Sequence, residues 1–457
     1  MHATLMPQTQ RIKCPTKSLC EHLEMKQLTS IFQARFRPLT RLLGGPDADP
    51  APADAPLPPL IRRKVPRTVI QGDTRGSLQI PCPPVTAEDA IREKHLSHAQ
   101  YLVRQERWED LTDLIETADR ARHLTPGLMP VADLLAYGAR ADVVGAAEHA
   151  LMDGPPEDDT PLLAGIEALE HLLAEHPKSH IMACIVAQAH MDIGWAWRGN
   201  SWDAEVPAQN RAVFEAHFDR AKDIISEFCP IHSDSPLLGT TCSSLLGGIP
   251  TEPREKANRY EKVIDLNPSN PRPMRALGNQ MLPRWKGSYE LLELEARRTA
   301  ARTAQIWGTG AYTWVQFDAI VYDDEACANL DLGFFIEGLH DILERRSDPY
   351  TANLLAAYCA NSIGQSYSGN DRADHHREEI GKCADWIVRK HMTELHPMVW
   401  AHAARGFDNN LRIHSTSRFA AAGRDDAMRI ITSLFKNELS AGKRIVFTDQ
   451  GPVAQHA

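Results

Sequence analysis

Short turns that contain proline or glycine interrupt this chain at fairly regular intervals, and each turn separates two segments with the apolar spacing of helices. Successive turns lie 53, 38, 41, 40 and 48 residues apart. This regular spacing fits helix-turn-helix repeats, whose units must stack because none can bury its apolar face alone. The sequence therefore predicts an all-α fold, an α-solenoid of degenerate repeats. The turns are marked by Pro177, Pro230, Pro268, Thr309, Pro349 and Pro397.

The chain divides into four parts. Residues 1–43 form a basic N-terminal segment, and residues 44–85 are a linker rich in proline and alanine followed by an extended arm, so this end is expected to be largely irregular. Residues 86–440 carry the helical pattern. The pattern opens at Thr86, a predicted N-cap that is followed by acidic residues in the first turn. Residues 441–457 are expected to be a C-terminal tail.

Charge and composition limit the classes of function. Residues 1–85 contain 12 basic and 6 acidic side chains, whereas residues 86–457 contain 38 basic and 54 acidic ones. Nucleic-acid binding needs a basic face, so the acidic body argues against it. No apolar run approaches the roughly 18–20 residues that span a bilayer. The 9 cysteines are scattered and form no C-x-x-C pair, which indicates reduced thiols in a cytoplasmic protein.

One proline-rich stretch, DLNPSNPRPMRALGNQMLPRWKGSYE at residues 265–290, is either a loop that holds an anion or a joint between two helices. Its prolines predict that one helix ends near Pro268 and that a short helix follows over residues 272–281. Ser288 is predicted to cap the next helix, and Trp285 to fill the joint between two repeat units.

The basic residues beside that joint leave the anion alternative open. A helix start binds anions readily, and Arg284 and Lys286 flank this one. Glu290 already places a negative charge in the first turn, however, and the chain contains no phosphate-binding loop. We therefore favour the joint.

The segment YEKVIDLNPSNPRPMRALG resembles a tetratricopeptide repeat (TPR), because its first helix ends in D-x-N-P and the second restarts within a few residues. Over residues 86–435 the chain resembles a group of uncharacterised bacterial TPR-like proteins that carry a P-R-W-x-G-S element. The matching segments are PRWKGS at residues 283–288 and GAYTW at residues 310–314. The resemblance implies an α-solenoid and brings no activity or cofactor with it.

Signatures of catalysis and of nucleotide binding are missing from the sequence: we find no phosphate-binding loop, nucleophile elbow, H-E-x-x-H or kinase motif. Asp371, His375 and Glu379 are four residues apart and would share one side of a helix, as metal ligands do. Charged neighbours make an exposed polar face the better interpretation. We predict a protein without catalytic residues, metal or cofactor.

Two groups of aromatic and basic residues are the candidates for contact with a partner. Tryptophan and arginine are favoured at protein interfaces, and helical repeats offer extended surfaces for such contacts. At least one of the tryptophans is nevertheless expected to pack in the core. The candidates are Trp195, Trp197, Arg198, Trp202, Arg284, Trp285 and Lys286.

Three functions follow from these features. The favoured one is a non-catalytic scaffold that binds a protein or peptide on the concave face of the solenoid. The second is an adaptor at a membrane surface, because the segment from Met25 to Leu43 lacks acidic residues and has apolar residues at roughly helical spacing. The third is an enzyme or small-ligand binder with a pocket between helices.

Overall fold

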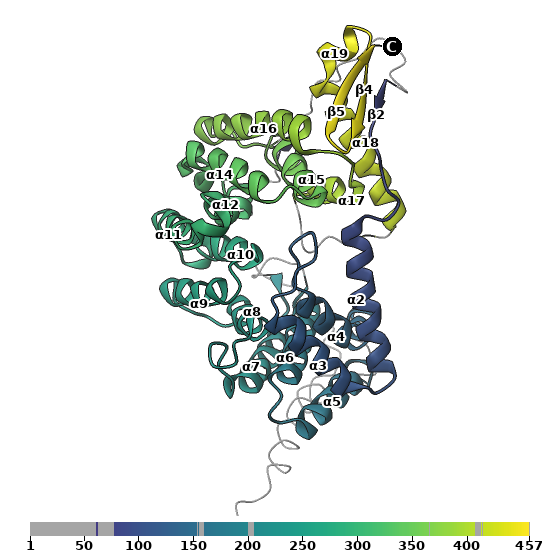
Figure 1. The fold of residues 1–457 in the computed structure, drawn as a ribbon. Helices are drawn as coiled ribbons and strands as arrows, with labels where there is room; N and C mark the ends of the chain where they lie inside the picture. Colours follow the sequence, from purple (N-terminus) through teal and green to yellow (C-terminus); the bar gives the residue numbers. More distant parts are fainter. Residues whose placement is uncertain are drawn as a thin grey trace, which may run out of the picture.

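The computed structural model describes residues 61–62, 77–152, 154, 160–199, 205–364, 366–406, 413 and 415–456. These residues are mostly helical, as predicted (Figure 1). The segment from Met25 to Leu43 and most of the N-terminal arm lie outside the described residues, as does Trp202.

Seven α-helices lie in the first half of the described chain. They are α2 (Ala87–Arg104), α3 (Trp108–Arg120), α4 (Val131–Ala150), α5 (Thr160–Glu175), α6 (His180–Arg198), α7 (Ala208–Ser226) and α8 (Pro236–Ser244). A 3₁₀ turn, η2 (Leu245–Gly247), follows α8.

The second half holds eleven more α-helices among the described residues. They are α9 (Pro253–Leu266), α10 (Arg272–Gln280), α11 (Tyr289–Trp307), α12 (Gly310–Tyr322), α13 (Asp324–Asn329), α14 (Leu332–Arg345), α15 (Pro349–Ala357), α16 (Asp371–His391), α17 (Pro397–Ala403), α18 (Thr416–Leu434) and α19 (Lys436–Ser440). A 3₁₀ turn, η3 (Pro283–Trp285), separates α10 from α11, and a π-helical turn, η4 (Tyr358–Ile363), continues α15.

The predicted turns are confirmed as helix starts. Pro349 and Pro397 are the first residues of their helices, and each of the other four marker residues lies one to six residues before a helix begins. The six helices are α6, α8, α10, α12, α15 and α17. Thr86 caps α2 as expected, because its side chain accepts a hydrogen bond from the Asp89 N–H while the Asp89 carboxylate reaches back to Thr86.

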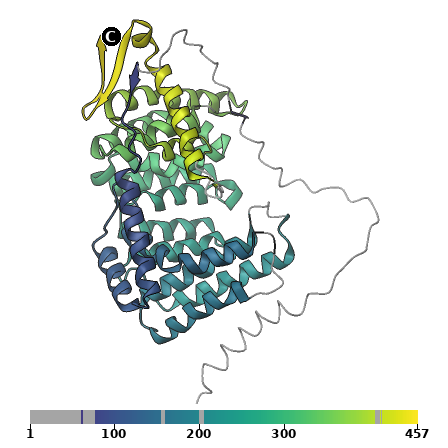
Figure 2. The same ribbon diagram turned by 90° about the vertical axis from the view of Figure 1, so that its right-hand side faces the viewer.

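Helices that are neighbours or next-nearest neighbours in sequence pack together. Helix α4 packs on α2 and α6, α6 on α7 and α8, and α8 on α9. Farther along, α10 packs on α12, α12 on α14, and α15 on α16 and α17. The helices α2–α7 lie at one end of the molecule, and α16–α19 lie at the other (Figures 1 and 2).

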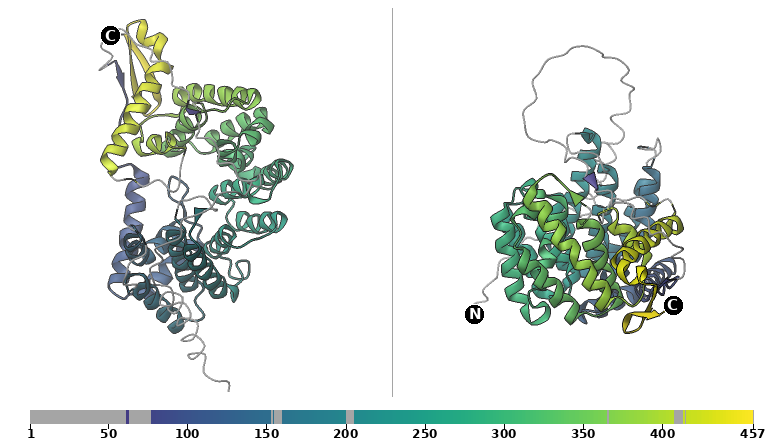
Figure 3. Two further views of the ribbon diagram at one scale, coloured as in Figure 1. Left: turned by 180° about the vertical axis from the view of Figure 1, so that it is seen from behind. Right: turned by 90° about the horizontal axis from the view of Figure 1, so that it is seen from above.

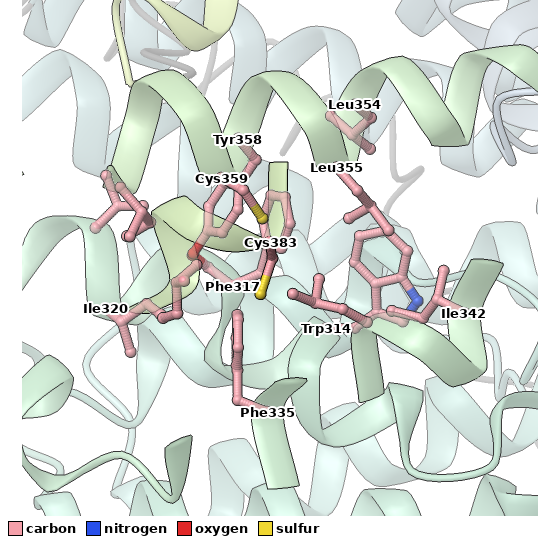
Figure 4. Packing of buried hydrophobic residues seen from close by; sticks show 14 of the residues in the cluster. Trp314, Phe317, Ile320, Phe335, Ile342, Leu354, Leu355, Tyr358, Cys359 and Cys383 are labelled. Carbon is pink, nitrogen blue, oxygen red and sulfur yellow. The ribbon is translucent and has the colours of Figure 1, made fainter. Parts of the chain in front are cut away.

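Two hydrophobic clusters fill the interior. One joins residues from Ala99 to Leu245, and the other is formed mainly by residues from Leu246 to Phe447. In the second cluster the rings of Phe317 and Tyr358 stack with centroids 3.7 Å apart, and the Tyr358 hydroxyl donates to the Phe317 carbonyl at 2.6 Å (Figure 4). Burial of a large side chain of this kind stabilises a fold by about 1.5–3 kcal/mol.

Short strands pair N-terminal residues with segments much later in the sequence. Strand β2 (Leu78–Gln79) pairs in parallel with β4 (Lys443–Thr448), which pairs antiparallel with β5 (Gly451–His456). Strand β1 (Ile61–Arg62) pairs antiparallel with β3 (Ser366–Tyr367). Residues 441–457, expected to be a tail, thus contain a β-hairpin that adds a small sheet to the helical fold. Seen from behind, this sheet lies beyond α18, and α18 approaches the start of α2 (Figure 3).

Candidate functional site

The candidate partner residues lie at two places, the end of α6 and the turn η3. At the end of α6 the two described tryptophans differ in environment. Trp197 is only 2% exposed and belongs to the first hydrophobic cluster, whereas Trp195 is 39% exposed. Residues i and i+2 point to different sides of a helix, which accounts for the difference. Trp195 is therefore the tryptophan of this helix that a partner can reach.

Trp195 is held from behind by aromatic rings. Its indole meets Phe214 and Phe218 edge-on, with centroids 4.9 and 5.9 Å away. The Arg198 guanidinium lies 5.7 Å from the Trp195 ring, within the range of a cation–π contact. The end of α6 thus presents a tryptophan and an arginine that are fixed in place before any partner binds.

The turn η3 lies at the predicted joint between α10 and α11, and it leaves Trp285, which was expected to fill that joint, partly exposed. Lys286 has left-handed backbone geometry, with φ 68°, and a Cβ on Gly287 would lie 1.9 Å from the Met281 oxygen. This tight reversal ends at Ser288, which caps α11 by accepting from the Leu291 N–H at 3.2 Å. The reversal leaves the Trp285 side chain 36% exposed.

Lys256, on α9, completes the surroundings of Trp285. Its Nζ donates to Gln280 Oε1 at 2.9 Å and to the Trp285 carbonyl at 3.3 Å, and lies 5.7 Å from the Trp285 ring. The residue is only 4% exposed, and this burial, together with the positive charge of Lys286, lowers the pKa of its ammonium.

Sequence reasoning missed Lys256, although a signal was present. Tyr260, Val263 and Ile264 are buried positions of α9, and Lys256 lies one turn before Tyr260 on that apolar side. A lysine at a core position of an amphipathic helix needs polar acceptors nearby. Its acceptors lie on the next helix and the turn after it, so periodicity alone does not reveal them.

Arg284 contacts α10 and α12. Its guanidinium donates to the Asn279 side chain and lies 5.3 Å from the Tyr322 ring at the end of α12. Burial lowers the pKa of Arg284, and the nearby Asp323 opposes this shift. We call Lys256, Arg284, Trp285 and Lys286 the Trp285 cluster.

The Trp285 cluster contains three cations that form no ion pair with the described carboxylates, although the charge of Asp323 acts on Arg284. Among the described residues, no carboxylate lies within ion-pair distance of Lys256, Arg284 or Lys286, while many other arginines of the chain are paired. Lys256 and Arg284 donate instead to neutral amide and carbonyl oxygens.

The start of α11 itself is already occupied by a carboxylate. The pKa of Glu290 is lowered by hydrogen bonds to its own backbone N–H and to Ser288, so its negative charge lies at the helix terminus. This arrangement disfavours the alternative of an anion bound at that terminus.

Other polar candidates serve internal contacts. Asp371, His375 and Glu379 all lie on α16, where the Glu379 carboxylate pairs with Lys382 at 2.6 Å. Within the described ranges, no group of three or more His, Cys, Asp or Glu residues is arranged to hold a metal ion. The seven described cysteines carry no disulfide.

A partly buried chain of polar side chains links α5, α6 and α7. His190 Nε2 lies 2.8 Å from Glu170, and His190 Nδ1 lies 2.9 Å from His217 Nδ1. Arg220 donates to both oxygens of Glu170 at 2.8 and 2.5 Å. The helices α5, α6 and α7 are thus connected by hydrogen bonds as well as by apolar packing.

None of the described helices is both long enough and apolar enough to cross a membrane. Comparison of the chain with protein-family models, with curated proteins and with solved structures finds no match.

Proposed function

We propose that this protein is a non-catalytic scaffold that binds an acidic segment of a partner protein at the Trp285 cluster. The observation that carries the proposal is the set of three cations, without a described carboxylate partner, around a partly exposed tryptophan. Tryptophan and arginine often dominate the energy of protein interfaces. Carboxylates or phosphates on the partner would neutralise the cations.

The electrostatics of the cluster favour an anionic partner. Lys286 is among the causes that lower the pKa of Lys256, so the two ammonium groups repel each other in the free protein. A bound carboxylate would relieve this repulsion, and a cationic segment would increase it. Binding to the cluster should therefore select acidic over basic segments.

We further propose that the helical fold is a degenerate TPR-like α-solenoid, in which residues 86–440 form one repeat domain. The six turns at helix starts and the packing of successive helices support this architecture. In a solenoid each unit adds to an extended binding surface. Trp195 and Arg198 would then extend the contact beyond the Trp285 cluster.

The proposal can be tested by selection from a displayed random peptide library, with the full chain as bait. We expect enriched peptides to be acidic and to bind the Trp285→Ala variant at least about tenfold more weakly, because a central aromatic anchor contributes about 2 kcal/mol or more. Tyr101→Ala is the matched control, because Tyr101 is an exposed aromatic residue on α2. Enrichment without acidic bias, or equal binding to the Trp285→Ala variant, would contradict the proposal.

A further inference from the structure

One edge of the helical fold carries both the Trp285 cluster and the strand pair of β1 and β3. The Arg284 guanidinium lies 5.3 Å from the ring of Tyr322, the last residue of α12. Helix α13 follows directly, and Glu325 in its first turn accepts a hydrogen bond at 3.1 Å from Asn370, the N-cap of α16. Strand β3 ends three residues before Asn370. The Trp285 cluster and β3 are therefore separated only by the end of α12 and the start of α13.

The direction of β1 aims the preceding residues at this edge. Ile61 lies opposite Tyr367, and the two strands run antiparallel. In such a pair, the chain before Ile61 continues on the side where β3 leads into Asn370. The residues that precede β1 thus approach β1 from the side of the α16 start, which is the side of the Trp285 cluster.

The sequence before β1 complements the Trp285 cluster in charge and in side-chain type. Residues 46–60 read PDADPAPADAPLPPL, with three aspartates, six prolines and no lysine or arginine. The cluster presents three cations around a tryptophan that is 36% exposed. Carboxylates form their strongest hydrogen bonds with such cations. Proline-rich segments dock on exposed aromatic rings, because little backbone entropy is lost when they bind.

These aspartates are close enough along the chain to contact the Trp285 cluster. Asp54, Asp49 and Asp47 lie 7, 12 and 14 residues before Ile61. A proline-rich chain spans about 3.1 Å per residue, which gives distances of up to about 22, 37 and 43 Å from β1. Two helix diameters, the breadth of α12 and α13, amount to about 20–24 Å. The length of this segment therefore matches the separation.

We propose that residues 46–60 dock on the Trp285 cluster of the same chain, with their aspartates at Arg284 and Lys286 and their proline rings against Trp285. This inference rests on the proposed function, because the segment would occupy the surface that binds the acidic partner. The partner must then displace the segment, so the chain regulates access to its own binding surface.

The same-chain contact is tested with the full chain and no partner. A carbodiimide couples a carboxylate to a lysine amine that touches it, and peptide mass spectrometry locates the amide. We expect links from Lys286 to Asp47, Asp49 or Asp54, and at least about tenfold fewer from Lys262, an exposed lysine of α9. Absence of Lys286 links would overturn the proposal.

Mixing unlabelled and nitrogen-15-labelled chains identifies the occupant. Links within one isotope are expected, because the segment and the Trp285 cluster belong to the same chain. Links that join the two isotopes would show that the segment of a second copy docks instead, and would overturn the same-chain contact.

Two variants separate docking from mere proximity along the chain. Trp285→Ala and Arg284→Gln should each lower the yield of Lys286 links at least about fivefold, because each removes part of the docking surface. Lys286→Arg keeps the charge but lacks the amine, so it should abolish these links and confirm their assignment. Thermal melting shows which variants are folded. An unchanged yield in folded Trp285→Ala or Arg284→Gln would overturn the docking.

Competition with a partner tests the regulation. Replacement of Asp47, Asp49 and Asp54 by asparagine should raise the affinity for a selected acidic peptide about tenfold in fluorescence anisotropy. This gain corresponds to a segment that covers the Trp285 cluster in about nine chains of ten. Replacement of the same three residues by glutamate keeps the charge and should leave the affinity near that of the wild type.

The two proposals fail separately. Equal affinity of the wild type and the asparagine variant would overturn the regulation and leave the proposed function intact. If no acidic peptide binds either protein while the Lys286 links form as expected, the proposed function fails and the same-chain contact stands.

Discussion

The Nζ atom of Lys256 donates a hydrogen bond to the carbonyl oxygen of Trp285 at 3.3 Å and lies 5.7 Å from the centre of its ring. The two residues come from α9 and from the turn after α10, so this contact fixes the turn against a neighbouring helix. It also places a nearly buried ammonium group directly behind the exposed indole. The Trp285 cluster is thus already assembled within the chain, which would lower the entropic cost of the binding that we propose.

Replacement of Lys256 by methionine tests whether the fold depends on its ammonium group. The hydrogen bonds of Lys256 stabilise the fold, but the desolvation of its charge opposes them. We expect the free energy of unfolding to change by no more than about 1 kcal/mol in urea denaturation. Lys262→Met, an exposed change on the same helix, is the control. A loss above about 3 kcal/mol would assign Lys256 a structural role.

Replacement of Gly287 by alanine should disrupt the turn that presents Trp285. The added Cβ would lie 1.9 Å from the Met281 oxygen, so the backbone must move. We expect a loss of about 2 kcal/mol or more in the free energy of unfolding. Gly145→Ala offers the contrast, because Gly145 lies within α4 with open space around it and should gain about 0.5–1 kcal/mol. Equal effects of the two changes would contradict the tight geometry of the turn.

Replacement of each of the two tryptophans at the end of α6 should affect the stability of the fold to a different degree. Trp197→Ala removes a buried ring and should cost about 3–5 kcal/mol, measured by thermal or urea unfolding. Trp195→Ala removes a ring that is partly exposed and packs on Phe214 and Phe218, so we expect a smaller loss. If Trp195→Ala destabilises the protein as much as Trp197→Ala, Trp195 belongs to the core and cannot serve as a free contact.

Asp133, on α4, should make stability depend on pH. Burial and the charge of Asp119 raise the pKa of its carboxyl, Arg272 and Arg140 oppose the shift, and the pKa that results is about 6. Because the folded pKa exceeds the unfolded value near 3.8, the carboxyl reduces stability as the pH rises from about 4 to 6, and the full reduction remains above that range.

Asp133→Asn should therefore stabilise the protein by about 1–3 kcal/mol at pH 8 and have little effect near pH 4, as urea denaturation at several pH values can show. Asp425→Asn, an exposed carboxylate on α18, is the control. A gain of equal size at both pH values would contradict the raised pKa.

Local sequence signals predicted a mostly helical fold and several of the helix ends. Thr86 and Ser288 cap helices because each side chain bonds to a backbone N–H only three residues away, a relationship that the sequence displays directly. The pairing of β2 with β4 joins residues from opposite ends of the chain, and no local pattern indicates it.

The same reasoning explains what could be predicted of the candidate site. Arg284, Trp285 and Lys286 are adjacent in sequence, so their grouping was visible. The exposure of Trp285 was not, because it depends on the backbone reversal at Lys286 and Gly287 and on contact with Lys256.

Charge reversal at Lys286 tests the central claim most directly. Fluorescence anisotropy would compare the binding of one selected acidic peptide to wild type, to Lys286→Glu and to Lys262→Glu, an exposed reversal on α9. Our account predicts that Lys286→Glu weakens binding about tenfold or more, that Lys262→Glu has little effect, and that added salt narrows the difference. Equal affinity for wild type and Lys286→Glu at low salt would contradict an acidic partner at the Trp285 cluster.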